Sequence, residues 1–337
     1  MIKKVVHINL NVGSGIEYCG DIFSSWLRER QDIEFFEIKE QDHHFYMSDI
    51  LVKIKPDIII VNEFEDRSIL CSSYYKKYNP EVKIIFLLHS WKSISVGMEE
   101  NPSNEEVLSF LFLRQCNAIL SLNCMPLSAK TYNLNIERMY FPVDSNIYKI
   151  TKNWSDREKD FLYLGTLGTP KFSEKFLDLI KDSDVFVDCY GYIPDRVSEL
   201  YKKKLLENEN IRYHGVAKQE EVAKIFNEYK YMVIPHDGYE IFNISILQSI
   251  LCGTIPLISN DRESLCFDSS WLNWANGFIF ECNKEEELIN NMLILKDKPF
   301  ETGDEISKKI SNEAMKKYSY FELKRKFNKI LEDVGGI

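Results

Sequence analysis

The chain has 337 residues, of which 45% are hydrophobic and 13% aromatic, so it can fill ordinary hydrophobic cores and is neither a disordered nor a fibrous protein. Its length corresponds to about two domains of roughly 100–200 residues each. The formal net charge of −10 disfavours nonspecific binding to nucleic acid, because phosphates are repelled at long range.

In the first half of the chain, short runs rich in β-branched and aromatic residues alternate with longer segments of helical periodicity. The expected strands lie near residues 3–10, 33–38, 57–62, 82–88, 118–122 and 138–141. The expected helices lie near 15–30, 46–54, 68–78, 104–115 and 126–132. None of the apolar runs approaches the ~18 residues that a membrane-spanning helix needs.

A polar segment, TKNWSDREKD, then separates this half from a second alternating pattern. Its expected strands lie near 160–165, 185–190, 211–214, 231–234, 254–258 and 277–280. Strands that alternate with helices predict βαβ units and parallel sheets. We therefore expect an α/β protein made of two facing, doubly wound, Rossmann-like domains.

The expected domain boundaries follow from the same pattern. We expect an N-terminal domain over 1–150 and a C-terminal domain over 151–315. The last segment, 316–337, is amphipathic and predicts a long helix that either closes the second domain or crosses back onto the first.

The eight cysteines are widely scattered and contain no C-x-x-C pair. Several lie inside apolar segments, as Cys189 does in VFVDCY and Cys252 in ILCGTIPLI. This pattern indicates buried, reduced thiols and neither a disulfide framework nor a zinc site. We expect a cytoplasmic protein without a metal centre.

Two glycine-containing turns follow expected strands and are candidate anion sites. In the first, Gly13 and Gly15 flank Ser14, but Tyr18 breaks the G-x-G-x-x-G pattern of dinucleotide-binding proteins. In the second, Gly165 and Gly168 precede Lys171, which stands close to the next expected helix. Backbone amides at such a turn, with a lysine beside them, can neutralise a phosphate. A tight turn without a ligand and a solvated lysine explain the same patterns.

A third candidate lies where the polar turn HDGYE meets a buried helical segment. Glu240 and Gln248 are eight residues apart, which is about two helical turns, so we expect both side chains on one helix face. A carboxylate and an amide placed there could bind the hydroxyls of a sugar or a ribose. A capping carboxylate and a buried polar residue are the alternative interpretation.

The segment GYEIFNISILQSILCGTIPLIS resembles the nucleotide-sugar-binding segment of GT-B glycosyltransferases, in particular glycosyltransferase family 4. The likeness rests on Glu240, Phe242, Gln248, Gly253 and Pro256. Other segments resemble the family in the same order along the chain. They are SGIE with Gly15, LLHS with His89, FPVDSNIY, RYHGVAKQEEVAKIF with Gly215 and Val216, and the closing KKYSYFELKRKF.

The resemblance implies a GT-B fold and a retaining, metal-independent hexosyltransferase. It would move a sugar from a nucleoside diphosphate sugar, its co-substrate, to a glycan, a lipid-linked molecule or another acceptor, without a cofactor. Catalytic roles fall to His89, Lys171 and Glu240. Donor-binding roles fall to Gly15, Gly165, Thr166, Gly168, Gly215, Val216, Phe242, Asn243, Ile244 and Gln248. A role in polysaccharide biosynthesis follows from the same resemblance.

The chain departs from the family pattern at two positions that matter for the donor. Thr166 stands where the family carries an arginine that holds the diphosphate, and Gln248 replaces the second glutamate. These departures motivate an alternative function, a non-catalytic GT-B subunit that binds an acceptor or a related transferase chain. A sugar-nucleotide epimerase is a further alternative, although no general acid–base set can be assembled for it.

The partners implied are a nucleotide sugar and a glycan or lipid-linked acceptor, with nucleic acid disfavoured by charge. A lipid-linked acceptor would bring a cytoplasmic enzyme into peripheral contact with the inner face of the membrane. The sequence leaves open this contact, the donor base and sugar, and the oligomeric state.

Overall fold

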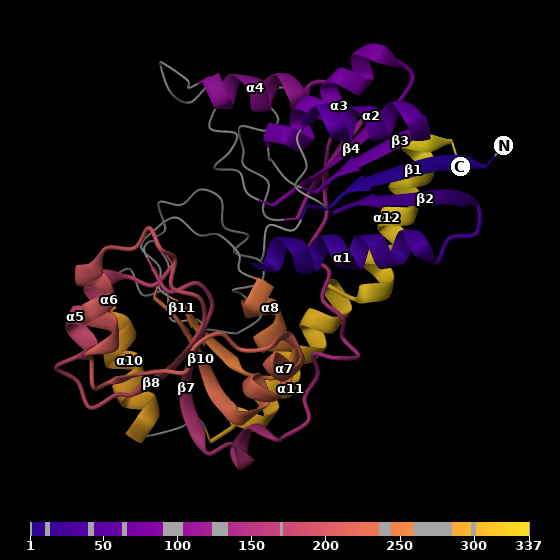
Figure 1. Cartoon of the computed structure of the whole chain (residues 1–337). Coiled ribbons are helices and arrows are strands. Elements are labelled where there is room, and N and C mark those ends of the chain that lie inside the picture. Colours follow the sequence, from indigo (N-terminus) through magenta and orange to yellow (C-terminus); the bar gives the residue numbers. More distant parts are fainter. Residues whose placement is uncertain are drawn as a thin grey trace. The chain divides into compact units, whose positions relative to one another are not determined.

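A computed structural model describes residues 2–336 apart from 11–13, 40–43, 63–65, 90–103, 123–133, 169–170, 236–243, 259–284 and 298–300. The chain divides into two compact units. Unit 1 joins residues 1–142 to 320–337, and unit 2 comprises residues 143–319. In each unit, helices alternate with parallel strands along the chain (Figure 1).

The described strands of unit 1 form one sheet in the order β2-β1-β3-β4-β5-β6, with every neighbouring pair parallel. Their bounds are β1 Lys3–Ile8, β2 Ile33–Ile38, β3 Ile58–Val61, β4 Lys83–Leu88, β5 Ala118–Ser121 and β6 Ile136–Arg138. The central strands β3, β4 and β5 are buried almost throughout. Their continuous apolar runs are those of strands covered on both faces.

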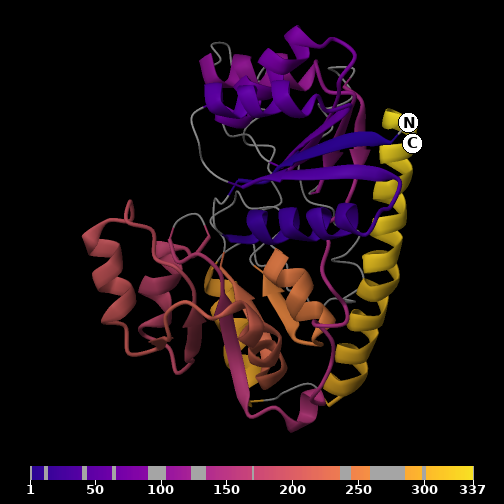
Figure 2. The same cartoon turned by 45° about the vertical axis from the view of Figure 1, so that its right-hand side comes forward.

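The helices of unit 1 are α1 Ser14–Arg28, α2 His44–Ile54, α3 Asp66–Tyr78, α4 Asn104–Leu113 and α12 Tyr320–Gly335. Helices α2, α3 and α4 lie on one face of the sheet, and α1 and α12 lie on the other (Figure 1). The apolar stripe of α12 packs on α1, where the ring of Phe327 lies 4.9 Å from that of Phe23 and 5.8 Å from that of Trp26. The last helix in the sequence thereby belongs to the same core as the first (Figure 2).

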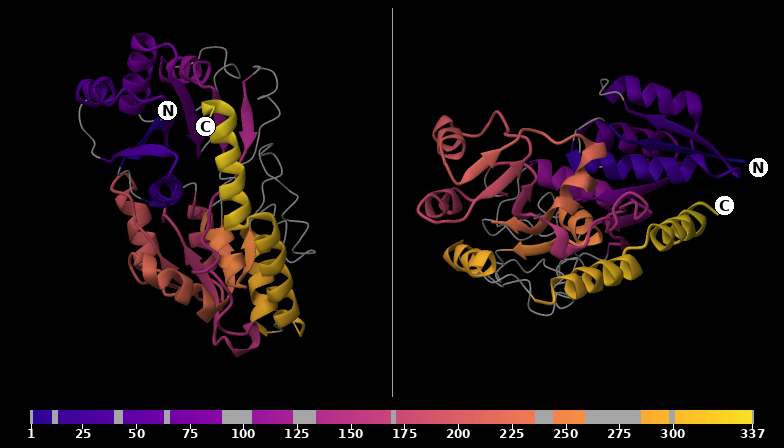
Figure 3. Two further views of the ribbon diagram at one scale, coloured as in Figure 1. Left: turned by 90° about the vertical axis from the view of Figure 1, so that its right-hand side faces the viewer. Right: turned by 90° about the horizontal axis from the view of Figure 1, so that it is seen from below.

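Unit 2 has a second sheet with the strand order β11-β10-β7-β8-β9, again parallel throughout. Its strands are β7 Lys159–Leu164, β8 Val187–Tyr190, β9 Ile211–Tyr213, β10 Tyr229–Ile234 and β11 Ile255–Ile258. Its helices are α5 Glu174–Ile180, α6 Glu199–Leu206, α7 Gln219–Glu228, α8 Ile244–Leu251, α10 Glu285–Asp297 and α11 Gly303–Lys317. Helices α5, α6 and α10 cover one face, and α7, α8 and α11 cover the other (Figures 1 and 3).

The two sheets confirm the expected α/β class with doubly wound parallel sheets. Each sheet has a point at which the strand order reverses, between β1 and β3 in unit 1 and between β7 and β10 in unit 2. Ligands of open α/β sheets bind at the carboxyl ends of the strands beside such a point. We therefore expect the candidate site residues at these two reversal points.

The structure differs from the sequence expectations at the end of unit 1. The strand expected over 138–141 forms at Ile136–Arg138, because β5 ends at Ser121 and offers the residues beyond Arg138 no further ladder. Residues 143–150 belong to unit 2, whereas the sequence pattern predicts them in the N-terminal domain. The side chain of Asn227 holds the backbone at Lys149 and Thr151, which explains the difference. The helix expected over 126–132 and the strand expected over 277–280 lie outside the described residues.

None of the helices in the described part of the chain combines the length and the apolar character that crossing a membrane requires.

Candidate functional site

The loop between β7 and α5 runs across the reversal point of the unit 2 sheet. Gly165 N donates to Tyr190 O at 3.0 Å, and Leu167 N donates to Tyr192 O at 2.9 Å, so the first part of the loop follows the end of β8. Ser173 N then donates to Pro235 O, directly after β10, at 3.0 Å. The described parts of the loop therefore bond residues at the carboxyl ends of β8 and β10, the strands on either side of β7.

This loop is the one that the sequence predicts to bind a diphosphate, and it contains Gly165, Thr166, Gly168 and Lys171. The hydroxyl of Tyr163, on β7, donates to Thr166 O at 2.7 Å and also reaches Lys171 O at 3.5 Å. Lys171 is half-buried and lies two residues before Ser173, which caps α5 by accepting from Phe176 N. The backbone at Lys171 is therefore held by the hydroxyl of Tyr163 and by the N-terminal cap of α5 at Ser173.

Glycines allow the neighbouring loops to approach this one closely. A Cβ on Gly191, which follows β8, would overlap the carbonyl oxygen of Gly165. Gly191 N in turn donates to Gly215 O at 2.8 Å, and Gly215 has the left-handed φ of +79° that favours glycine. The structure thus connects Gly215 with Gly165, two positions far apart in sequence. Val216, which follows, is 67% exposed.

Helix α8 begins at Ile244 and carries Gln248, which is only 5% exposed. Gln248 hydrogen-bonds the hydroxyl of Tyr148, and that oxygen also accepts from Gln219 Nε2 at 2.7 Å. Burial raises the pKa of Tyr148, so the hydroxyl stays protonated. The predicted partners Glu240, Phe242 and Asn243 lie outside the described residues, so the shared helix face of Glu240 and Gln248 stays a prediction.

In unit 1, three polar side chains follow neighbouring buried strands at the reversal point. His89, after β4, is 8% exposed, and its Nε2 lies 3.0 Å from Oδ1 of Asn62, which follows β3. Asn62 Nδ2 donates to Oδ1 of Asn9, beyond β1, at 2.8 Å. Burial lowers the pKa of His89 to about 3, so the imidazole is neutral at physiological pH. The remaining predicted residue of this unit, Gly15, lies in the first turn of α1.

Sequence reasoning missed Asn9, Asn62 and Tyr163. The signal for the asparagines is a polar residue directly after a buried apolar run, a position that His89 also holds, although His89 itself is singled out by the family resemblance. Gly20 on α1 allows the two asparagine side chains to pack against this helix, because a Cβ there would overlap both of them. Tyr163 gave no such signal, since it is one of several aromatic residues in a strand.

The units divide the predicted residues between them. His89 and Gly15 belong to unit 1, whereas Lys171, Gln248 and the other described donor-binding candidates belong to unit 2. Among the residues that the structure places, no three His, Cys, Asp or Glu side chains gather in a way that could hold a metal ion.

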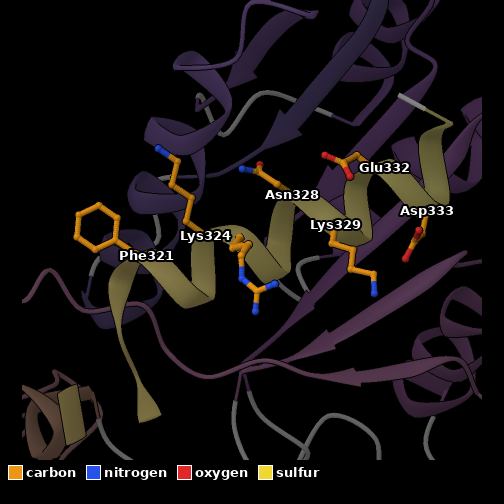
Figure 4. A pocket seen from close by; sticks show the side chains of 7 residues that line it. Phe321, Lys324, Asn328, Lys329, Glu332 and Asp333 are labelled. Atoms are coloured by element: carbon orange, nitrogen blue, oxygen red, sulfur yellow. The ribbon is translucent and has the colours of Figure 1, made fainter. Parts of the chain in front are cut away.

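Figure 4 shows a shallow pocket on the outer face of α12, which contains none of the predicted site residues. It is lined by Phe321, Lys324, Arg325, Asn328, Lys329, Glu332 and Asp333. Several of these charges are paired, Lys324 with Glu29 on α1 and Arg325 with Glu322 at 2.8 Å. We interpret this surface as a solvated helix face.

No family model matches the chain. An uncharacterized 41.2 kDa protein in the cps region of Klebsiella pneumoniae is 29% identical over 120 residues, which are 35% of this chain and 32% of that protein. The match therefore spans about a third of that relative's length.

Solved structures resemble the whole chain. HepE of Anabaena, in complex with UDP-glucose, superposes with a TM-score of 0.75 at 11% identity, covering 98% of this chain and all of HepE. Sucrose-phosphate synthase of Thermosynechococcus elongatus gives 0.72 at 9% identity, with 98% of each chain covered. The UDP-GlcNAc 2-epimerase of Neisseria meningitidis, bound to UDP-GlcNAc, gives 0.62 at 10% identity, with 98% of this chain and 100% of the epimerase covered. Identities this low speak for the fold alone, and they confirm the expected architecture: the chain has the GT-B fold.

Proposed function

We propose that the chain is a glycosyltransferase that moves a sugar from a nucleoside diphosphate sugar to an acceptor. The observation that carries the proposal is the β7–α5 loop, whose described residues 165–168 bond the end of β8 and whose Ser173 bonds Pro235 after β10, beside the reversal point of the unit 2 sheet. The loop combines closely approaching glycines with a lysine, the combination that suits a diphosphate. Structures of the same fold that hold UDP-glucose or UDP-GlcNAc support this choice of ligand.

In the proposed reaction, the bond between the sugar C1 and the diphosphate oxygen breaks while a bond from C1 to the acceptor oxygen forms. Lys171 and backbone amides of the loop stabilise the charge that develops on the leaving diphosphate, and such preorganised donors are a large term in catalysis. The acceptor's proton passes to the departing diphosphate. Retention of the anomeric configuration and independence of metal ions are part of the proposal, and the family resemblance supports them.

Thr166 changes how the diphosphate would be held. A hydroxyl offers one donor where a guanidinium would offer a charged, bidentate one. Lys171 then supplies most of the positive charge that the described part of the loop brings to the ligand. Glu240 and Gln248 would bind donor hydroxyls, and His89 would accept a hydrogen bond from a sugar hydroxyl as a neutral imidazole.

We propose a uridine diphosphate hexose as the first donor to test, because the similar structures hold UDP-glucose and UDP-GlcNAc. The acceptor would be a glycan or a lipid-linked molecule, and with the latter the protein would act peripherally at the inner face of a membrane. Sedimentation with vesicles that contain the acceptor lipid tests this last point, since a protein that acts on a soluble glycan stays in the supernatant.

The experiment that tests the function measures UDP release and product mass from UDP-glucose and UDP-GlcNAc, with and without EDTA. Loss of the Lys171 charge in Lys171→Ala should weaken UDP-sugar binding by about tenfold or more, which corresponds to about 1.4 kcal/mol. Lys175→Ala is the matched control, because Lys175 is exposed and pairs with Glu286 at 3.0 Å. NMR of the anomeric proton of the product reports retention or inversion.

The same experiment separates the alternatives. Conversion of one UDP-sugar into its epimer without release of UDP would replace the transferase with an epimerase. Binding of neither UDP-sugar, nor of GDP-, ADP- or TDP-sugars, would contradict the proposal and favour the non-catalytic subunit.

A further inference from the structure

We infer that Asn62 is a positioning residue: together with Asn9 it fixes His89 in the tautomer that carries its proton on Nε2, so that Nδ1 is the ring's hydrogen-bond acceptor. The inference deepens the proposed function, because it states which nitrogen of His89 can accept a hydrogen bond from a ligand. Only its consequence for catalysis rests on the proposed function. Two carboxylates lie at the opposite end of this hydrogen-bond network from His89.

Those carboxylates, Asp21 and Glu37, accept hydrogen bonds and do not donate them. Asp21 pairs with Lys39 at 2.5 Å, and Glu37 pairs with Arg28, so the oxygens of both side chains act as acceptors toward these cations. The amide of Asn9 lies 3.0 Å from Asp21 Oδ1 and 3.2 Å from Glu37 Oε1. The atom of Asn9 that faces them is therefore the NH₂ group, and its oxygen faces Asn62.

The amide of Asn62 is oriented by two acceptors. One of its atoms lies 2.8 Å from Asn9 Oδ1 and 3.2 Å from the backbone carbonyl oxygen of Ile16. Because both of these atoms can only accept, the atom of Asn62 between them is Nδ2. Oδ1 of Asn62 then faces His89 Nε2 at 3.0 Å. A carbonyl oxygen cannot donate, so Nε2 of His89 carries the proton.

A neutral imidazole has a single N–H, so its other nitrogen carries a lone pair. Burial keeps the ring neutral, because it lowers the pKa of His89 to about 3. Nδ1, which is buried in this structure, is thus the acceptor atom of the ring, and under the proposed function a sugar hydroxyl would donate to it. The opposite tautomer would present an N–H at that position and would require an acceptor on the ligand.

The same logic assigns the opposite tautomer to the other buried histidine of this network. Ser24 Oγ donates to Glu37 Oε1 at 2.5 Å, so its one proton is used there. His7 Nδ1 lies 2.8 Å from Ser24 Oγ and must donate to it. His7 therefore carries its proton on Nδ1, and it serves as an internal reference for His89.

Side-chain ¹⁵N NMR of the full chain, uniformly labelled and without ligand, tests the assignment directly. Long-range ¹H–¹⁵N correlations distinguish the two neutral tautomers, and His89→Gln identifies which of the six histidine patterns belongs to His89. We expect an Nε2–H pattern for His89 and an Nδ1–H pattern for the other non-titrating ring. An Nδ1–H pattern for His89 would overturn the inference.

Variants of Asn62 separate positioning from folding. Asn62→Leu removes the side-chain acceptor but keeps the backbone of residue 62, which also hydrogen-bonds the ring, so the Nε2–H preference of His89 should weaken while the His7 pattern is unchanged. If this variant does not fold, Asn62→Asp keeps the size and the acceptor, and it should retain Nε2–H with a ring that titrates at a higher pH than in the wild type. Asn210→Ala is the control, because Asn210 is a buried asparagine of unit 2 that bonds backbone carbonyls, and its loss should leave the His89 pattern unchanged.

The functional consequence is measured separately. Loss of one neutral hydrogen bond to the donor sugar should lower kcat/KM of Asn62→Leu by about tenfold, and Asn210→Ala should not share this effect. An Nε2–H pattern in a chain without transferase activity would contradict the proposed function and leave the tautomer assignment standing. An unchanged kcat/KM in an active Asn62→Leu whose Nε2–H preference has weakened would overturn the positioning role.

Discussion

His7 and His89 are held neutral inside unit 1, and this makes them a source of acid sensitivity. Burial lowers the pKa of each to about 3, and for His7 the nearby charges of Lys39 and Arg28 act in the same direction. In the unfolded chain both rings titrate near their ordinary value of about 6.5. Between these values the unfolded state binds more protons than the folded state, so acid favours unfolding.

We therefore predict that the free energy of unfolding falls as the pH falls from about 6.5 toward 3, and that neither histidine contributes a pH dependence above that window. Each ring contributes a slope of up to about 1.4 kcal/mol per pH unit. Urea titrations of the wild type and of His89→Gln, from pH 8 to 5, isolate one ring from the carboxylates that titrate at lower pH. Parallel stability curves for the two proteins would contradict the assignment of His89 as a buried neutral ring.

Gly20 is the position on α1 at which any side chain would collide with the asparagine pair. Alanine normally favours a helix by about 1 kcal/mol over glycine, but here its Cβ would overlap Asn9 and Asn62. We predict that Gly20→Ala destabilises the protein by about 1–3 kcal/mol, the usual cost of overpacking. Chemical denaturation measures the change. In Asn9→Ala, where the colliding side chain is shortened, the cost of Gly20→Ala should be smaller, and strict additivity would argue against the collision.

These residues mark the limit of what the sequence could predict about the site. Gly165 and Lys171 lie between an expected strand and an expected helix, and this local pattern singles them out, whereas His89 is singled out by the family resemblance. The partners Asn62 and Tyr163 could not be assigned from the sequence, because their contacts with the site residues depend on which strand ends lie side by side in the sheet. That order is set by the sheet and not by neighbouring residues in the chain.

At the scale of elements, unit 2 depends on a buried guanidinium. Arg157 is only 2% exposed. Its two terminal nitrogens donate to oxygens of Lys152, Phe226, Tyr229, Cys252 and Thr254. Burial lowers the pKa of Arg157 to about 10, so the group keeps its charge at neutral pH. One side chain thereby joins the ends of α7 and α8 to the start of β10.

Arg157→Met should remove these donors, leave buried carbonyl oxygens without partners and destabilise unit 2 by about 3 kcal/mol or more. Arg212→Met is the matched control, since Arg212 is exposed and lies over the ring of Phe186 at 4.9 Å, and it should cost about 1 kcal/mol or less. Hydrogen exchange should show the loss of protection in β7 and β10, with unit 1 unchanged. Equal costs for the two variants would contradict the role assigned to Arg157.

The elements themselves were largely predictable, and the exceptions have a physical cause. The strands β3, β4 and β10 are apolar runs bounded by polar residues, so their positions follow from the sequence. The run over 138–141 also looks like a strand, because Met139 and Phe141 are buried, yet the ladder to β5 ends at Arg138. Burial and strand pairing produce the same sequence pattern, and only the partner strand distinguishes them.

At the scale of the whole molecule, unit 1 is completed by the last segment of the chain. Helix α12 supplies Phe327, which is fully buried against Phe23 and Trp26 of α1. Pairs such as Lys324 with Glu29 join the same two helices. The N-terminal core is therefore assembled from both ends of the sequence, and it cannot be complete until residues 320–335 have been made.

Two phenylalanines on α12 test this dependence. Phe327→Ala should destabilise unit 1 by about 3–5 kcal/mol, because a buried ring is replaced by a cavity. Phe321→Ala, at a position that is 69% exposed, should change the stability by about 0.5 kcal/mol or less. Denaturation followed by hydrogen exchange in β1 and α1 assigns the change to unit 1. A small effect of Phe327→Ala would show that α12 is dispensable to that core.

Binding of a nucleotide sugar's diphosphate by the β7–α5 loop can be measured by calorimetric titration of the full chain with UDP-glucose and UDP-GlcNAc. We predict saturable binding of one donor that survives EDTA, is weakened about tenfold or more in Lys171→Ala, and is unchanged in Lys175→Ala. At a hundred times the dissociation constant, the same donor should add about 2.7 kcal/mol to the free energy of unfolding. Binding that is equal in the wild type and Lys171→Ala, or no binding of any nucleotide sugar, would contradict the assignment of this loop as the diphosphate site.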